Sequence, residues 1–406
     1  MFDRALYPEI CEDIGDGILP SQAIKAMVAT GQVSATPDVS DSQIQPASID
    51  LRLGREAYRV QASFLPGHET TLLTKVHELL DGTIDLTAQT PALLEPGVVY
   101  IIPLLERLRL PGDVQGIANP KSTTGRLDIF TRLITEHGDQ FDRVPKGYRG
   151  LLYAEVSSRT FPVRVRSGMA LNQLRFVGGN ATNILDPIRD GDLKALSVRE
   201  PLVYDAEGHP TSNRVGDGIQ LTVDLEGENA TDIVAYKAKE NPRAIELDRI
   251  GHYDVADYWD AIPRPRSGNI ILAKGGFYLL ASKAKVSVPL SHAAEMVAHE
   301  SSMGEFRVHY AGFFDPGFGY GARKGDIPGT KAVLEVRAYE VPILLEDDDV
   351  VGRLHYYPMA AVPNVAYGPS IGSSYQQQGL ALSKQFKRRD ARRESAATMN
   401  QALATA

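Results

Sequence analysis

Hydrophobic residues along this chain occur in short runs with alternating polar positions, a pattern typical of β-strands. The clearest runs in the first half lie at residues 97–104, 149–156, 161–166 and 170–176. The second half of segment 44–54 alternates in the same way. The chain also holds 36 glycines and 25 prolines, which favour many short strands joined by turns. The pattern therefore predicts an all-β fold.

One short helix interrupts this pattern near the start of the chain, at residues 20–32. Ile24, Met27 and Val28 recur at helical spacing and share one apolar face, while Ser21 is a candidate N-cap and Gly31 ends the helix. We therefore expect only short helices at the periphery of the strands.

The order of these segments recurs in the second half of the chain. Segments 219–227, 276–280 and 331–336 repeat the first-half segments 44–54, 97–102 and 151–156. The separation is 178 residues for Tyr100 and Tyr278, and 180 residues for Glu155 and Glu335. A nearly constant separation predicts two tandem copies of one all-β unit. We expect the first copy at 1–180, a linker at 181–217, the second copy at 218–365 and a C-terminal segment with a tail at 366–406.

Composition narrows the class of protein. A single cysteine, Cys11, excludes an intrachain disulfide and any cysteine-rich zinc site. No apolar run approaches the roughly 18 residues of a membrane helix, and the N-terminus has no signal-peptide pattern, so we expect a cytoplasmic protein without membrane contact. The net charge of −8 argues against a partner that is a nucleic-acid polymer. However, residues 121–175 hold ten Lys and Arg against five Asp and Glu, which favours a small anionic ligand.

The candidate anion site lies inside this basic window, in residues 121–126. Its six residues are Lys121, Ser122, Thr123, Thr124, Gly125 and Arg126. Hydroxyls and backbone N–H groups beside a glycine can surround phosphate oxygens, and the two cations neutralise them. The lysine precedes the single glycine, so the segment is not the nucleotide-binding loop in which lysine follows the glycines.

Several motifs together resemble the dCTP deaminase family. Segment 45–54 is similar to its N-terminal strand, and 121–126 to its Arg-Ser-Ser-x-x-Arg phosphate loop. In the second copy, 311–318 resembles the base-pocket segment that the family shares with dUTPases, and 333–335 the strand that carries its catalytic glutamate. Tyr367 and the run 375–379 resemble the segment that closes over the nucleotide.

The resemblance implies a fold, a reaction and an assembly. The fold is a distorted β-barrel of the dUTPase-like, or β-clip, type, here present twice. The reaction is hydrolytic deamination of dCTP to dUTP and ammonia, which supplies dUMP and dTTP synthesis. It proceeds without zinc, with Mg²⁺ carried by the triphosphate. The assembly is a homo-oligomer with threefold symmetry, such as a homotrimer, with sites shared between neighbouring barrels.

The same resemblance assigns roles to residues of both copies. Phosphate and substrate contacts fall to residues 121–126 and to Ala311, Asp315, Tyr367 and Gln378. Ser122 and Arg126 also help to position the attacking water. The base that activates this water is a carboxylate, either Glu155 or Glu335.

The two copies differ from the family pattern in complementary ways. The first copy has Phe141 to Gly147 where the family has Ala-x-x-x-Asp-Pro-Gly. The second copy has Glu300 and Glu305 at the positions of the loop arginines, where each carboxylate would repel a triphosphate by roughly 1 kcal/mol or more. Since alternating copies cannot close a ring of three, symmetry favours rings of like copies. That arrangement pairs Ser122 and Arg126 with Glu155. A meeting of unlike copies would instead bring the first-copy loop to Ala311, Asp315 and Glu335.

Two other functions fit the same residues. A dUTP diphosphatase, or an enzyme with both activities, would need a water-orienting aspartate near the α-phosphate, and Asp50 and Asp315 are both candidates. A non-catalytic nucleotide sensor is the third alternative, because one copy looks degraded relative to the family pattern.

Overall fold

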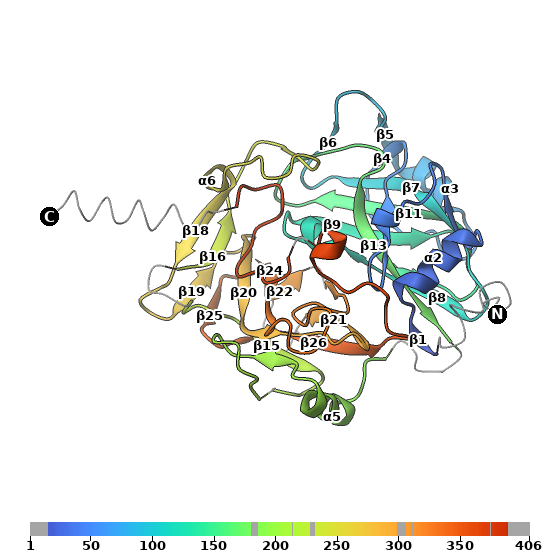
Figure 1. The fold of residues 1–406 in the computed structure, drawn as a ribbon. Coiled ribbons are helices and arrows are strands. Elements are labelled where there is room, and N and C mark those ends of the chain that lie inside the picture. The colour runs from blue at the N-terminus through green and yellow to red at the C-terminus, as the bar shows by residue number, and fades with distance from the viewer. Residues whose placement is uncertain are drawn as a thin grey trace.

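The structure, a computed structural model of the 406-residue chain, describes residues 15–179, 186–212, 214–227, 232–298, 306–309, 312–373 and 375–388. Nearly all of its regular elements are strands, and the few helices lie at the periphery (Figure 1). The all-β prediction is therefore confirmed. Among the described residues, no helix is long and apolar enough to cross a membrane.

Each copy contains one six-stranded sheet, and the two sheets have the same topology. The first follows the order β5-β4-β7-β11-β9, with β2 added to β7. The second follows β18-β16-β20-β24-β22, with β14 added to β20. The bounds in the first sheet are β2 Val33–Ala35, β4 Glu56–Val60, β5 Leu80–Asp85, β7 Val99–Arg109, β9 Ile129–Thr135 and β11 Arg149–Ser158. Those in the second are β14 Val203–Tyr204, β16 Ile233–Ala238, β18 Trp259–Pro263, β20 Phe277–Val286, β22 Phe306–His309 and β24 Thr330–Ala338.

A smaller sheet in each copy repeats as well. In the first copy β13 joins β1, β3 and β8, and β8 pairs with β10. In the second copy the order β15-β26-β21-β23 is equivalent. The bounds in the first copy are β1 Gly17–Ile18, β3 Ile49–Arg52, β8 Val114–Pro120, β10 Arg143–Val144 and β13 Ala170–Gly178. Those in the second are β15 Ile219–Thr222, β21 His292–Ala298, β23 Phe313–Phe314 and β26 Val350–Pro358.

The register of the central strands confirms the tandem repeat residue by residue. Val156 of β11 lies opposite Tyr100 of β7, and Val336 of β24 lies opposite Tyr278 of β20. Each copy also has a short outer pair, β6 (Ala92–Leu94) with β12 (Val163–Val165) and β19 (Asn269–Leu272) with β25 (Ile343–Glu346). Strand β17 (Ile245–Glu246) of the second copy pairs in parallel with β12 and so adds a third strand to the β6–β12 pair of the first copy.

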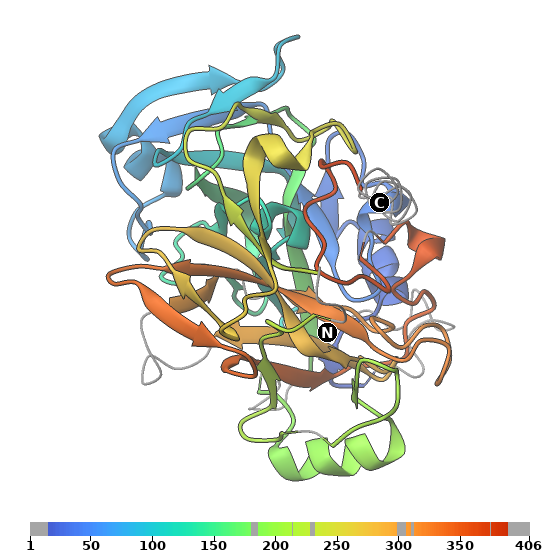
Figure 2. The ribbon, with the colours of Figure 1, turned by 90° about the vertical axis from the view of Figure 1, so that its left-hand side faces the viewer.

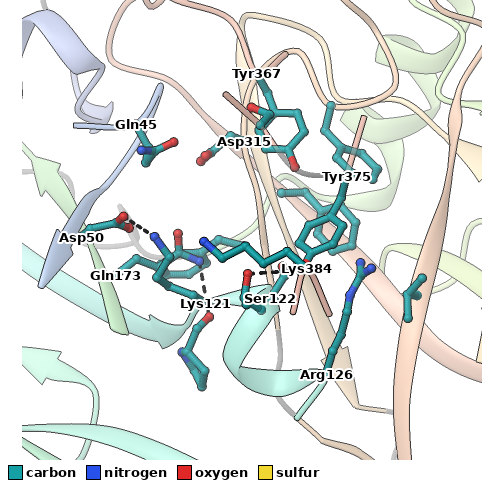
Figure 3. A pocket seen from close by; sticks show the side chains of 18 of the residues that line it. Gln45, Asp50, Lys121, Ser122, Arg126, Gln173, Asp315, Tyr367, Tyr375 and Lys384 are labelled. Atoms are coloured by element: carbon teal, nitrogen blue, oxygen red, sulfur yellow. Dashed lines mark hydrogen bonds and ion pairs between the residues drawn. The ribbon is translucent and has the colours of Figure 1, made fainter. Parts of the chain in front are cut away.

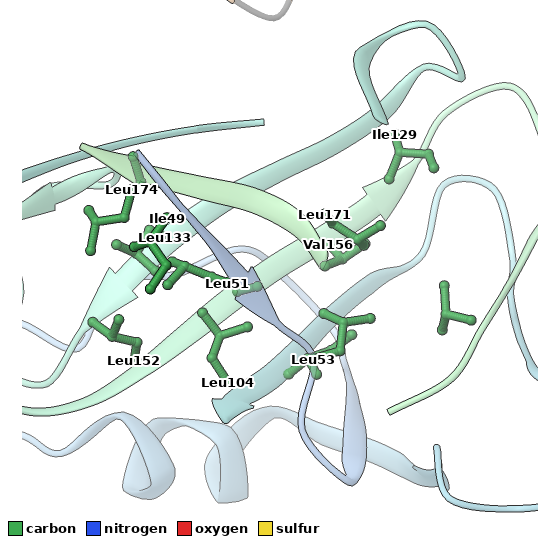
Figure 4. Packing of buried hydrophobic residues seen from close by; sticks show 14 of the residues in the cluster. Ile49, Leu51, Leu53, Leu104, Ile129, Leu133, Leu152, Val156, Leu171 and Leu174 are labelled. Carbon is green, nitrogen blue, oxygen red and sulfur yellow. The ribbon is translucent and has the colours of Figure 1, made fainter. Parts of the chain in front are cut away.

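Hydrophobic side chains from both sheets fill each barrel. In the first copy, leucine, isoleucine and valine residues of β3, β7, β9, β11 and β13 interdigitate (Figure 4). The same cluster takes in Trp259 and Phe277 of the second copy and Phe386 of the C-terminal segment. Burial of each large apolar side chain stabilises the fold by about 1.5–3 kcal/mol, so this shared cluster joins the two copies firmly.

The helices are short and peripheral, as the sequence indicates. Helix α2 (Ser21–Ala29) is the predicted one, but its N-cap is Pro20, and Ser21 is its first residue. The other helical segments among the described residues are α3 (Leu72–Leu79), α4 (Ser122–Gly125), α5 (Asp190–Arg199), α6 (Val255–Tyr258), η1 (Asp41–Gln43) and η3 (Pro369–Ile371).

The predicted linker 181–217 is structured in its described part. Helix α5 lies on the outside of the second copy, as Figure 2 shows, and contributes Leu193 and Leu196 to that copy's core. Leu202 and Val203 are buried in the same cluster, because β14 pairs with β20. These residues therefore belong to the second barrel.

Candidate functional site

The 121–126 segment lies at the end of β8 and forms a single helical turn, α4, where the sequence analysis expected a loop. Lys121 is the N-cap, and its carbonyl accepts the N–H groups of Thr124 at 2.8 Å and Gly125 at 3.0 Å. Ser122 and Thr123 line a pocket beside this turn. Thr124 instead donates its hydroxyl to the Leu171 carbonyl at 3.0 Å, and Gly125 is buried. Only part of the predicted phosphate segment therefore faces the pocket.

Arg126 is held by the C-terminal segment of the chain. Its Nη1 donates to Oε1 of Gln378 at 2.9 Å and to the Ala381 carbonyl at 2.8 Å. The guanidinium carbon lies 3.7 Å from the centroid of the Tyr375 ring, a cation–π contact. Arg126 is only 3% exposed, and its Nε has no hydrogen-bond partner among the described residues. A buried cation fixed in this way can bind a phosphate oxygen without further ordering.

Lys121 forms an ion pair with Asp50 on the same side of the pocket. Asp50 belongs to β3, whose residues pair with β13, and Gln173 of β13 lies opposite Asp50 in register (Figure 3). The strand pairing therefore brings a carboxylate to the lysine that was expected to bind phosphate.

The second copy supplies the opposite wall of the pocket. Asp315, Phe313, Phe314 and Phe318 line it, together with Tyr367. Gly317 has a φ of +98°, and a Cβ at this position would lie 2.8 Å from the backbone nitrogen of Tyr367. Only glycine permits this close approach, which brings the Asp315 turn against the C-terminal segment.

Arg175 of the first copy fixes this wall from behind. It is fully buried in β13, and its Nη2 lies 3.1 Å from Oδ1 of Asp315. The guanidinium also donates to the carbonyls of Ala294 at 2.9 Å and Phe314 at 3.0 Å. Burial raises the pKa of Asp315, whereas the Arg175 charge lowers it. One first-copy arginine thus joins the two copies at the pocket.

Glu335 lies in the same pocket, on the central strand β24. It is 4% exposed, and among the residues that the structure describes no cation lies within ion-pair distance of it. Burial raises the pKa of Glu335 to about 8, against a smaller opposite effect of Arg126. A carboxyl group that titrates near neutral pH can exchange protons with a bound reactant.

Glu155 occupies the equivalent position in the first copy but does not line this pocket. Its Oε1 lies 2.6 Å from Nη2 of Arg132, its neighbour on β9. The Arg132 guanidinium also stacks over the Phe141 ring at 3.4 Å and donates to Ser63 Oγ at 2.9 Å. The described structure therefore brings Ser122 and Arg126 together with Glu335. The ring of like copies that symmetry favoured would require Glu155 there.

The C-terminal segment closes the pocket on its remaining side. Tyr367 and Gln378, which the resemblance assigns to substrate contacts, line it. Ala311, Glu300 and Glu305 lie outside the described residues. Gln45, Gln173, Arg175 and Lys384 were not predicted to be near the pocket. Gln45 and Gln173 lie on segments that the resemblance or the strand pattern had marked, so a polar residue among apolar ones was the available signal.

Comparisons with known proteins agree with this architecture. Residues 15–180 match the family model described as the 2'-deoxycytidine 5'-triphosphate deaminase (DCD) N-terminal domain, and residues 189–386 match that of the C-terminal domain. The chain is similar to a dCTP deaminase of Halorubrum lacusprofundi, with 28% identity over 201 residues, which are 49% of this chain and 91% of that protein. It is also similar to a "dCTP deaminase, dUMP-forming" of Parafrankia sp., with 30% identity over 158 residues, or 39% of this chain and 74% of that protein.

A solved structure resembles most of the chain. It is the crystal structure of a 2'-deoxycytidine 5'-triphosphate deaminase from Agrobacterium tumefaciens, with a TM-score of 0.77 and 44% identity. The match covers 85% of this chain and 99% of the other. The repeated barrel, the two family models and this neighbour agree, and the chain belongs to the dCTP deaminase family, in a form with two tandem copies of the fold.

Proposed function

We propose that this chain deaminates dCTP to dUTP and ammonia in the pocket between its two copies, with Glu335 as the general base. The observation that carries the proposal is the buried Glu335, with a pKa of about 8, in one pocket with the cationic α4 turn. In the proposed complex, the triphosphate of dCTP lies against Ser122, Thr123 and Arg126. The cytosine ring lies among the aromatic side chains around Asp315.

The proposed chemistry needs one group that both takes and gives a proton. The Glu335 carboxylate removes a proton from water as the water oxygen bonds to C4 of cytosine. The protonated Glu335 then gives this proton to the exocyclic nitrogen, the C4–N bond breaks, and ammonia leaves. Arg126 favours the carboxylate form of Glu335 through its charge. Ser122 and Arg126 position the attacking water, which is the role that the family resemblance assigns to them.

Magnesium enters this proposal as part of the substrate, bound to the triphosphate oxygens. We further propose that the enzyme acts in the cytoplasm, where its product supplies dUMP and dTTP synthesis. Assembly around a threefold axis remains a prediction, which sedimentation of the purified protein tests.

The pH profile of kcat/KM tests the role of Glu335. Because the base must be deprotonated and its pKa is about 8, kcat/KM should fall on acidification from pH 9 to pH 6. Below the pKa the decline should approach tenfold per pH unit. An ordinary carboxyl, with a pKa near 4.5, would give a flat profile over this range.

The loss of Arg126 should act mainly on substrate binding. Arg126→Ala removes a charge-assisted contact, so the KM for dCTP should rise roughly 10- to 100-fold. Glu305→Ala, in the acidic stretch that replaces the loop in the second copy, is the control and should change KM little. Equal effects of the two substitutions would contradict a phosphate site in the first copy.

A bifunctional enzyme is the second candidate, because the Parafrankia relative is described as dUMP-forming. Incubation with dCTP, dUTP and CTP, with separate assays for ammonia and pyrophosphate, distinguishes the candidates. Deamination alone releases ammonia from dCTP, whereas a bifunctional enzyme also releases pyrophosphate. Binding without either product would support the nucleotide-sensor reading and reject the deaminase proposal.

A further inference from the structure

The C-terminal strap, residues 375–386, runs across the α4 turn. At its start Tyr375 stacks on Arg126. Near its end the Ser383 hydroxyl donates to the Thr123 carbonyl at 3.0 Å. The strap thus contacts the proposed phosphate site at two points, Tyr375 and Ser383.

The end of the strap is anchored in an aromatic cluster of the second copy. Phe386 is 3% exposed, and its ring centroid lies 5.5 Å from that of Tyr258 and 6.1 Å from that of Trp259. The backbone N–H of Gly251 donates to the carbonyl of Lys384 at 2.9 Å. Such anchoring on both sides fixes the position of the Lys384 backbone and lowers the entropy cost of placing its side chain.

The Lys384 side chain extends into the pocket toward Lys121, as Figure 3 shows. Within the described part of the chain, its ammonium group has no hydrogen bond or ion pair. Desolvation lowers the pKa of Lys384, and the nearby Lys121 charge lowers it further, whereas Asp50 acts in the opposite direction. An unpaired ammonium beside another lysine indicates a place for an anion.

Charge balance in the pocket leads to the same conclusion. Lys121 is already paired with Asp50, so this pair offers little net positive charge to a ligand. Arg126 and Lys384 are the lining cations without a carboxylate partner among the described residues. A triphosphate would otherwise meet one such cation.

We propose that Lys384 is a phosphate-binding residue of the dCTP site, delivered by the C-terminal strap and contacting the β- or γ-phosphate. This inference rests on the proposed function of the pocket. The free ammonium suits a phosphate oxygen as a compact point charge.

Direct binding of dCTP, dCDP and dCMP to the Glu335→Gln protein tests the proposal without turnover. Adding Lys384→Met should weaken dCTP binding about 10- to 100-fold, the usual effect of losing a charge-assisted contact. The loss should be smaller for dCDP and near zero for dCMP. Lys384→Arg should restore much of the affinity for dCTP.

The matched control is Lys387→Met, because Lys387 directly follows the strap but pairs with Asp254 at 2.7 Å, outside the pocket. It should leave all three affinities unchanged. Equal dCTP affinity in the Lys384→Met and Lys387→Met proteins would overturn the proposal, and so would an equal loss for dCMP and dCTP. If the wild-type chain binds dCTP but releases no ammonia, the deaminase function is rejected. The dCTP affinities of the Lys384→Met and Lys387→Met proteins would still test the role of Lys384.

Discussion

Glu335→Gln should lower kcat for dCTP deamination by about 10²- to 10⁴-fold, the usual contribution of a general base, and leave dCTP binding intact. The amide keeps the shape of the carboxyl group but cannot accept a proton from water. The measurement is ammonia release at saturating dCTP, together with calorimetric titration of the nucleotide.

Glu155→Gln is the matched control for this experiment. It makes the same change at the equivalent strand position, where the carboxylate pairs with Arg132 and lies outside the pocket. Its kcat should stay near the wild-type value. A slow Glu155→Gln protein beside a normal Glu335→Gln protein would instead place the chemistry in a ring of first copies.

Arg175→Met should cost the folded protein roughly 3–5 kcal/mol, because it leaves buried carboxylates without their cation. Asp315 is paired with Arg175 at 3.1 Å. Glu295, whose Oε1 accepts from Asn119 at 2.9 Å, is also stabilised as a carboxylate by the Arg175 charge. Urea unfolding at neutral pH measures the loss.

The pH dependence of this loss gives a second readout. Without Arg175, the folded-state pKa of both carboxyl groups rises further above the unfolded value. A raised carboxyl pKa destabilises the fold above the unfolded pKa, near 4, and the deficit should therefore shrink as the pH falls toward 4. Arg214→Met removes an exposed partner of Asp348 and should cost less than about 1 kcal/mol. Equal losses in the two variants would show that Arg175 does not join the copies.

The fold could be predicted from the sequence because the same strand pattern occurs in two tandem copies. Runs such as 149–156 and 331–336 alternate clearly, and the separation of Glu155 and Glu335 marked equivalent strands that the register later confirmed. Strand β9 has no such clear alternation, so the sequence did not predict that Arg132 lies beside Glu155. That missing neighbour, together with the symmetry argument, is why the sequence analysis leaned toward Glu155 over Glu335.

The sequence also did not predict which residues lie between the two copies. Arg175 reads as an ordinary residue of a strand, and only its burial against Asp315 shows that it lies between the barrels. Lys384 likewise lies in a segment without periodicity, and its position depends on how Phe386 packs about 130 residues away along the chain, on Tyr253 and Tyr258. Symmetry reasoning favoured rings of like copies over a meeting of unlike copies, whereas the pocket described above is lined by both copies of one chain.

In the function proposed above, one chain supplies a whole site, with Arg126 from its first copy and Glu335 from its second. Arg126→Ala and Glu335→Gln chains carrying different tags can be co-expressed and purified through both tags, and ammonia release from dCTP can then be measured. If each site lies within a chain, the mixed protein should be no more active than the two variants alone. Recovery of deamination in the mixture would place the two residues of a site on different chains and contradict the account.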